Sequence, residues 1–408
     1  MKIALVSYEY PPDTAVGGIG TYVAQIAQLL QQRQHQVEVF AGSPSRSGSC
    51  VESGILVHRV QAPRPDFATA IAPIFHQRHR IAPFDVMEGG ECGAETRVIV
   101  EQNPDVPFVI RLHTPSFLID EINTVPPTWD LQARRFLGAL RRGQRPTPFP
   151  QLHYNPQDDV ERRLTLQADL IASPSRALGE CLIDRWQLPS DRLRYLPYPY
   201  VPTPAFLEIP STTETQTVTF LGRLEIRKGV TDFAKAIPQI LRRHPNTRFR
   251  FVGQALPSPQ YGVDMQQYLQ RWLKPYQRSI EFTGAIALDQ IVQFLEATDI
   301  CVFPSLWENF PNVCLEAMAA ARGIVGSTSG GMVEQLDNGR CGRLVPPKQP
   351  DAIASAVIEL LDHPEVRMEL GAAARARVLN CYNQDCIGQQ QEALYAETIS
   401  LHRTLAIH

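Results

Sequence analysis

An alternation of short apolar segments with helical patterns starts twice along this chain, and it constrains the fold more than any other feature. In the first half, the apolar segment KIALVSY precedes a helical pattern, and HQVEVFAG, PFVIRLHT and ADLIASPS predict further strands. Strands that alternate with helices predict a parallel sheet built from right-handed βαβ units. The first half therefore predicts a doubly wound α/β domain.

A proline-rich and then polar segment, Tyr195–Gln216, has the composition of a linker, and the alternation restarts after it. The helices expected in the second half are Val230–Arg243, Asp264–Leu273, Leu288–Ala297 and Asn312–Ala321. A length of 408 residues also suits two domains of about 200 residues each.

We therefore predict an α/β fold of two Rossmann-like, doubly wound domains, 1–203 and 204–387, facing each other across a central ligand-binding cleft. A last helix, Ile387–Leu405, is expected to cross back, so that 388–408 joins the first domain.

Composition excludes several classes of protein. The formal net charge of -3 gives no overall attraction to nucleic acid. No segment approaches the roughly 20 apolar residues of a membrane span, and the chain opens directly on a strand. We therefore expect a cytoplasmic protein without a secretory signal. The eight cysteines are scattered without zinc-binding spacing, which is typical of reduced, buried thiols.

Glycines precede the first helix, where free N–H groups and the helix dipole favour a phosphate. Gly17 and Gly18 follow a long proline-containing loop, so the GxGxxG spacing of dinucleotide folds is absent. The second strand ends in VFAG, without an acid to hold a ribose, which argues against a nicotinamide enzyme. A tight turn remains the alternative interpretation of the two glycines.

Three further polar side chains follow strand ends. His113 closes a buried strand and is expected to face the cleft, although a core or capping histidine is the alternative. Arg223 and Lys228 frame the segment GRLEIRKG before a helix and suit a diphosphate clamp. Solvated surface cations are the alternative for this pair.

Two acids stand eight residues apart in WENFPNVCLEAMAA. Glu308 follows the strand CVFPS, and Glu316 lies in the next helix among apolar neighbours. This spacing does not suit two carboxylates that share a proton, and it is too open for a divalent cation. Separated acids instead suit two sets of hydroxyls on one elongated ligand, with helix N–H groups between them for phosphate.

The chain resembles the retaining glycosyltransferases of family 4, which have the GT-B fold. The resemblance spans nearly the whole length, through GGIG, the HT of LHTPSF, GRLEIRKG, the E-x7-E motif ENFPNVCLEAMA, and GGMVEQLDNGRCGRLVPP. E-x7-E together with the upstream arginine and lysine is specific for this family.

The resemblance implies a role for each matching residue. Glu308 would hold donor-sugar hydroxyls and Glu316 the ribose hydroxyls, while Arg223 and Lys228 would neutralise the diphosphate in place of a metal ion. His113 would lie near the transferred sugar. The remaining donor-binding positions would be Gly17 and Gly18 at the diphosphate, Gly284 at the base, and Asn309, Phe310, Pro311, Asn312 and Val313 around the sugar and phosphate.

Pro311 departs from the family pattern, in which many relatives carry glycine. Proline has no N–H, so one backbone contact to the donor sugar is lost, or is replaced by the side chain of Asn309 or Asn312.

A basic amphipathic helix is predicted over Trp129–Arg142, with arginines on one face and apolar residues on the other. We hypothesise peripheral contact with the inner face of an anionic membrane, beside a lipid-linked acceptor. A core-packing helix with a solvated basic face is the alternative.

The resemblance, together with these residues, implies a retaining hexosyltransferase that needs no cofactor or metal. We expect a UDP-sugar donor, with UDP-glucose first and a GDP-sugar as the alternative, and a glycan or lipid-linked acceptor of envelope or exopolysaccharide synthesis. Nucleic acid is not expected as a partner. The rival functions are a GT-B-like nucleotide-sugar epimerase and an inactive nucleotide-sugar-binding subunit.

Overall fold

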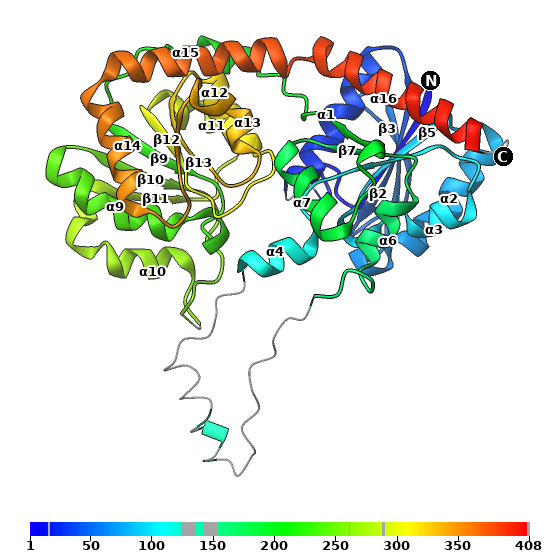
Figure 1. The fold of residues 1–408 in the computed structure, drawn as a ribbon, viewed down its shortest axis with the longest axis horizontal. Coiled ribbons are helices and arrows are strands. Elements are labelled where there is room, and N and C mark those ends of the chain that lie inside the picture. Colours follow the sequence, from blue (N-terminus) through cyan, green and yellow to red (C-terminus); the bar gives the residue numbers. More distant parts are fainter. Residues whose placement is uncertain are drawn as a thin grey trace.

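The computed structural model describes residues 1–14, 17–123, 136, 138–139, 141, 154–260, 262–287 and 290–405. It contains two sheets surrounded by helices, which stand side by side (Figure 1). The first sheet uses strands β1–β8 and the second uses β9–β14. The predicted fold class, two doubly wound Rossmann-like domains, is confirmed.

The first sheet has the strand order β3-β4-β2-β1-β5-β6-β7-β8. Its strands pair in parallel except for the antiparallel pair β3 and β4. The bounds are β1 Lys2–Ser7, β2 Gln36–Ser43, β3 Gly48–Glu52, β4 Ile55–Gln61, β5 Val86–Gly90, β6 Phe108–Arg111, β7 Leu170–Ser173 and β8 Leu193–Tyr195.

The second sheet is parallel throughout, with the order β11-β10-β9-β12-β13-β14. Its bounds are β9 Thr217–Leu221, β10 Arg248–Val252, β11 Ile280–Gly284, β12 Ile300–Phe303, β13 Gly323–Ser327 and β14 Arg343–Val345. The central strands are buried on both faces, as an all-parallel sheet covered by helices requires.

The helices of the first domain are α1 Gly18–Gln32, α2 Phe67–Ile81, α3 Arg97–Gln102, α4 Ser116–Asn123, α6 Val160–Gln167 and α7 Arg176–Trp186. Those after β8 are α8 Pro204–Glu208, α9 Val230–Arg243, α10 Met265–Trp272, α11 Ile291–Glu296, α12 Asn312–Ala319, α13 Met332–Gln335, α14 Pro350–Asp362, α15 Pro364–Cys381 and α16 Gln384–Leu405. Helix α9 shows how they are specified, because its buried side chains recur at helical spacing over Val230, Phe233, Ile237 and Ile240.

Both sheets reverse their strand order beside their first strand. The reversal lies between β1 and β5 in the first sheet and between β9 and β12 in the second. Loops at such a switch point diverge and leave room for a ligand at the carboxyl ends of the strands. The topology therefore singles out the loops after β1 and β5, and those after β9 and β12, as the places for a site.

Helix α16 crosses from the second domain back onto the first (Figure 1). Ile387, Leu394 and Tyr395 are buried in the apolar cluster that includes α1. An ion pair stabilises the exposed side of the helix, because Arg33 Nη2 lies 2.8 Å from Glu392 Oε2. The crossing joins the two domains through a packed helix as well as through the linker.

Candidate functional site

The Glu308 carboxylate, in the loop after β12, meets two cations from the loop after β9. Lys228 Nζ donates a hydrogen bond to Glu308 Oε1, and Arg227 Nη1 lies 3.4 Å from the same oxygen. Ser305 Oγ donates to it over 3.3 Å. Burial raises the pKa of Glu308, but the two cations outweigh burial and hold that pKa below its ordinary value. Glu308 is therefore a carboxylate at neutral pH.

Arg223 and Lys228, which the sequence predicted as a pair, lie in different environments. The Arg223 side chain is 48% exposed, and its Nη2 lies 3.2 Å from Glu225 Oε1. Arg227, which the sequence analysis did not select, is 9% exposed and bridges Glu225 and Glu308, with Nη2 3.0 Å from Glu225 Oε1. The sequence signal that could have identified Arg227 is its position directly before Lys228. The structure thus brings Lys228 and Arg227 to Glu308, and leaves Arg223 at the exposed edge.

Two glycines let these loops approach each other closely. Gly330 has φ 86°, and a Cβ there would lie 1.9 Å from the carbonyl oxygen of Glu308. Gly229 has φ 68°, and its Cβ would lie 1.9 Å from the carbonyl oxygen of Pro304. A side chain at either position would push the loops apart and separate Lys228 from Glu308.

Glu316 lies on α12 in the opposite electrostatic environment. Its Oε2 is buried without a hydrogen-bond partner among the described residues. Burial raises the pKa of Glu316 to about 8, so most of this carboxyl is protonated at neutral pH. Glu308 is charged and paired, whereas Glu316 is half-buried and its buried Oε2 has no partner among the described residues, so the two acids do not act as a proton-sharing dyad. A ligand hydroxyl that bonded Glu316 would relieve the cost of its unpaired oxygen.

The start of α12 lies between these acids. Pro311 is the N-cap residue, at φ -72° and ψ 124°, and no side chain caps the helix. Asn312 and Val313 form the first helical positions, whose N–H groups no helical carbonyl can accept. Phe310 is buried, and its ring centroid lies 5.7 Å from that of Tyr198. The helix start therefore offers N–H groups to an anion, whereas the Phe310 ring packs between the domains.

Asn309 connects this loop to the first domain. Its Nδ2 donates to the carbonyl oxygen of His113, and Ser175 Oγ donates to its Oδ1 over 2.8 Å. Nearby, the Glu334 carboxylate accepts hydrogen bonds from the first two N–H groups of α7, at 2.9 and 3.0 Å. Both polar atoms of the Asn309 side chain thus make contacts between the domains.

His113 follows β6, and the protein holds it from several sides. Its N–H donates to both carboxyl oxygens of Glu91 at 2.9 Å, and its Nδ1 lies 2.7 Å from Tyr198 Oη. Burial lowers the pKa of His113 to about 3, so the ring is neutral. Among the described residues Nε2 has no hydrogen-bond partner, which leaves it available to a ligand.

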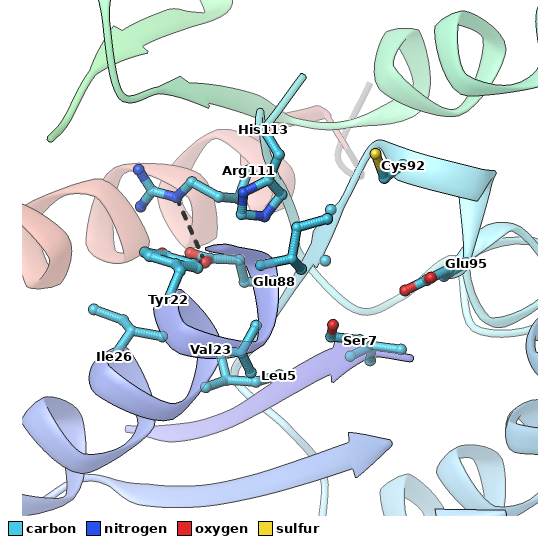
Figure 2. Close-up of a pocket in the computed structure, with 14 residues that line it drawn as sticks. Leu5, Ser7, Tyr22, Val23, Ile26, Glu88, Cys92, Glu95, Arg111 and His113 are labelled. Atoms are coloured by element: carbon cyan, nitrogen blue, oxygen red, sulfur yellow. Dashed lines mark hydrogen bonds and ion pairs between the residues drawn. The ribbon is translucent and has the colours of Figure 1, made fainter. Parts of the chain in front are cut away.

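A buried polar network supports the first-domain side of the site, beside a cavity of about 10 Å³ that His113 also lines (Figure 2). Tyr22 Oη donates to Glu88 Oε1 over 2.6 Å, and Arg111 Nε lies 3.6 Å from that oxygen. Arg111 also donates to Gln391 of α16 over 2.6 Å. Sequence reasoning missed this network, because its members come from four separate elements.

Of the predicted glycines, Gly17 and Gly18 lie at the interface between the domains, whereas Gly284 lies at an open edge of the second sheet. Gly17 caps α1 in an extended conformation, and a Cβ on Gly18 would lie 3.9 Å from Asn312 Nδ2. The start of α1 therefore meets the start of α12. Gly284 ends β11 at φ 73° with open space around it, and no described contact brings it to the other predicted residues.

The membrane contact predicted from the sequence concerns the segment Trp129–Arg142. Most of Trp129–Arg142 lies outside the described residues. In the part of the chain that the structure describes, no helix has the length and apolarity that a bilayer crossing requires.

Comparison with known protein families divides the chain at the same place as the two sheets. Residues 17–199 match the model of the glycosyl transferase 4-like domain, and residues 215–363 match that of glycosyl transferases group 1. The glycogen synthase of Mycobacterium tuberculosis is 24% identical to this chain over 97% of it and 94% of the relative.

Solved structures resemble the whole chain. Sucrose-phosphate synthase from Thermosynechococcus elongatus has a TM-score of 0.72 at 21% identity, covering 98% of this chain and 99% of that one. Anabaena HepE, solved in complex with UDP and glucose, has a TM-score of 0.66 at 18% identity, with 98% and 99% covered. At these identities the likeness establishes the fold, which is the GT-B arrangement predicted from the sequence.

Proposed function

The chain belongs to the GT-B glycosyltransferases of the family 4 type, and from that premise we propose that it transfers a hexose, with retention, from a nucleotide-diphosphate sugar. The observation that carries the proposal is the buried Glu308 carboxylate, ion-paired with Lys228 and Arg227, beside the uncapped start of α12. This combination offers a hydrogen-bond acceptor to sugar hydroxyls and donors to a diphosphate.

Lys228 is the central cation of the proposed donor site. When a diphosphate leaves, negative charge develops on its oxygens, and preorganised cations and N–H groups stabilise that charge. Lys228 and the N–H groups of α12 would stabilise it directly, while Arg227 holds Glu308 in place. Arg223 is 48% exposed and pairs with Glu225, so in this proposal it would exchange that contact for the phosphates at the outer edge. These cations would take the role that a metal ion has in other sugar transferases.

Retention is proposed through attack on the front face of the sugar. The acceptor hydroxyl oxygen would bond to the anomeric carbon as the bond from that carbon to the diphosphate breaks. Its proton would pass to the departing phosphate. Glu308 is already ion-paired and His113 is neutral and buried, so neither is poised as a charged nucleophile. Contact between the domains through Asn309 would orient the reactants and exclude water.

UDP-glucose is the proposed donor, with a GDP-sugar as the alternative. Support comes from the fold shared with Anabaena HepE, which was solved with UDP and glucose. The acceptor, a glycan or lipid-linked glycan of envelope or exopolysaccharide synthesis, would lie on the first domain near His113. A cytoplasmic location, with peripheral contact through Trp129–Arg142, belongs to the same proposal.

Thermal unfolding in the presence of UDP-, GDP- and ADP-sugars tests the donor assignment. A ligand that binds the folded state raises the unfolding temperature, and UDP-glucose is expected to raise it most. If no nucleotide sugar stabilises the protein, the proposal is refuted. Incubation of the bound donor without acceptor then separates the rivals. Slow hydrolysis supports a transferase, an epimer product identifies an epimerase, and complete inertness identifies a binding subunit.

A further inference from the structure

We propose that the side-chain amide of Asn312 binds hydroxyls of the donor hexose and supplies the hydrogen-bond donor that Pro311 lacks. The inference rests on the proposed function and identifies the residue that recognises the donor sugar. It makes Asn312 a specificity-determining position of the donor site.

The starting point is a gap in the row of backbone donors at α12. Pro311 is the N-cap residue and has no N–H, so the series of N–H groups at the helix start begins one position later, at Asn312. The two positions are adjacent, so a side chain at the second can deliver an N–H to the region that the first leaves without one.

Asn312 carries an amide that the protein itself does not use. Its Oδ1 is buried and has no hydrogen-bond partner among the described residues. Its Nδ2 points toward the other domain, 3.9 Å from the position that a Cβ on Gly18 would occupy. Gly18 has no side chain, so at the start of α1 this residue places only its backbone toward Nδ2.

Asn309, the other asparagine of this loop, is not available for the same task. Its Nδ2 donates to the carbonyl oxygen of His113, and its Oδ1 accepts from Ser175. Both ends of that amide are fixed between the domains. The two asparagines thus have separate functions: Asn309 joins the domains, and Asn312 faces the ligand.

The free donor and the free acceptor on Asn312 favour a sugar over a phosphate. A hydroxyl both donates and accepts, so neighbouring sugar hydroxyls can satisfy Nδ2 and Oδ1 together. A phosphate oxygen only accepts, and it would leave the buried Oδ1 unpaired at a continuing cost. A sugar of the ligand, rather than its diphosphate, therefore completes this amide, and we assign it to the donor hexose because Glu316 is the residue proposed for the ribose.

Calorimetric titration of wild type and Asn312→Ala with UDP and UDP-glucose tests the inference. Loss of contacts to sugar hydroxyls is expected to weaken UDP-glucose binding about ten- to a hundredfold and to leave UDP binding unchanged. The unfolding temperature of the free protein is expected to stay level or rise, because the substitution removes a buried unpaired oxygen.

A second substitution makes the test specific to the missing N–H. Pro311→Ala restores a backbone donor at a φ of -72° and ψ of 124°, which alanine adopts without strain. In the Asn312→Ala background it is expected to recover part of the lost affinity for UDP-glucose.

The outcomes separate the inference from the function on which it rests. Unchanged UDP-glucose binding in Asn312→Ala, or an equal loss for UDP and UDP-glucose, overturns the inference while the donor assignment stands. If Pro311→Ala does not restore UDP-glucose affinity in the Asn312→Ala background, the Asn312 side chain does not replace the N–H that Pro311 lacks, and that part of the inference is refuted. If wild type binds UDP but no UDP-, GDP- or ADP-sugar, the proposed function is refuted, and this inference is refuted with it.

Discussion

Replacement of Glu316 by glutamine should stabilise the free protein above neutral pH and weaken its binding of nucleotide. The prediction follows from the burial of this carboxyl, which raises its pKa from 4.5 to about 8 and leaves Oε2 without a partner. A folded-state pKa above the unfolded value means that the folded protein binds the proton more tightly. That stabilisation is fully present below the unfolded pKa and is lost as the pH rises through the folded one.

The size of the effect follows from the two pKa values. They are about 3.5 pH units apart, and each unit corresponds to about 1.4 kcal/mol of unfolding free energy, which gives ~5 kcal/mol as an upper limit. Opening of the domains that lets water reach the carboxylate reduces this value. Glutamine cannot ionise, so Glu316→Gln keeps the stability that wild type loses between pH 4.5 and 8.

The assay is thermal or urea unfolding of the free protein at pH 5 and pH 8.5. Glu91→Gln is the matched control, because burial and Glu161 also raise the pKa of Glu91 to about 8, but its partner is the His113 N–H. Both variants are expected to exceed wild type by several degrees at pH 8.5 and to match it near pH 5. A deficit at pH 8.5, or a difference that does not change with pH, would refute the assignment of Glu316 as a buried, unpaired acid.

Nucleotide binding distinguishes the two variants. If Glu316 accepts hydrogen bonds from ribose hydroxyls, glutamine removes a charged acceptor at pH 8.5, where this carboxyl is mostly ionised, and the affinity for UDP at that pH should fall about tenfold or more. Glu91→Gln should leave UDP affinity unchanged, since Glu91 lies behind His113 on the other domain. Equal UDP affinity in wild type and Glu316→Gln would sink the ribose role but not the stability argument.

Three further predictions concern turnover. Lys228→Ala and Glu308→Ala should each lower kcat at least about a hundredfold through loss of preorganised electrostatic contacts, and full activity in either would refute their roles. Asn309→Ala should lower kcat while UDP affinity holds, since Asn309 bonds His113 and Ser175 rather than the donor region; parallel losses in both would contradict this. EDTA should leave turnover unchanged, and a loss restored by Mg²⁺ would show that these cations do not replace a metal.

Strands β9–β13 of the second sheet were predicted because each is a short apolar run between helical patterns, whereas β14 was not, since its three residues, RLV, are too few to show such a run. Helix α9 occupies Val230–Arg243, the range expected from its apolar spacing. In the first sheet, β5 was missed, since its five residues, VMEGG, combine an acid with two glycines and lack an apolar run. The hairpin strand β3, GSCVE, is mostly exposed and polar, so the pattern of a buried strand is absent there. The boundary between 203 and 204 stays a prediction.

Site residues that stand in one short motif could be predicted from the sequence, whereas contacts between segments far apart in the sequence could not. Glu308 and Lys228 were found because each stands beside a strand end in a short, specific motif. Arg227 was missed because arginine is usually solvated, and only its burial between Glu225 and Glu308 distinguishes it from Arg223. The role of Asn309 depends on a contact with His113 in the other domain, which no local pattern encodes.

The polar atoms around α12 fall into two groups, and the division itself carries information about the ligand. Glu308 and Asn309 are paired within the protein, so they fix the geometry of the loop before a ligand arrives. Oε2 of Glu316 and Oδ1 of Asn312 lie on the same helix, and both are buried without a partner in the described part of the chain. Unpaired buried acceptors reduce stability, and a hydroxyl-bearing ligand is the chemical class that satisfies both. They are one turn apart on the same side of α12, so one ligand that carries several hydroxyls would satisfy both together.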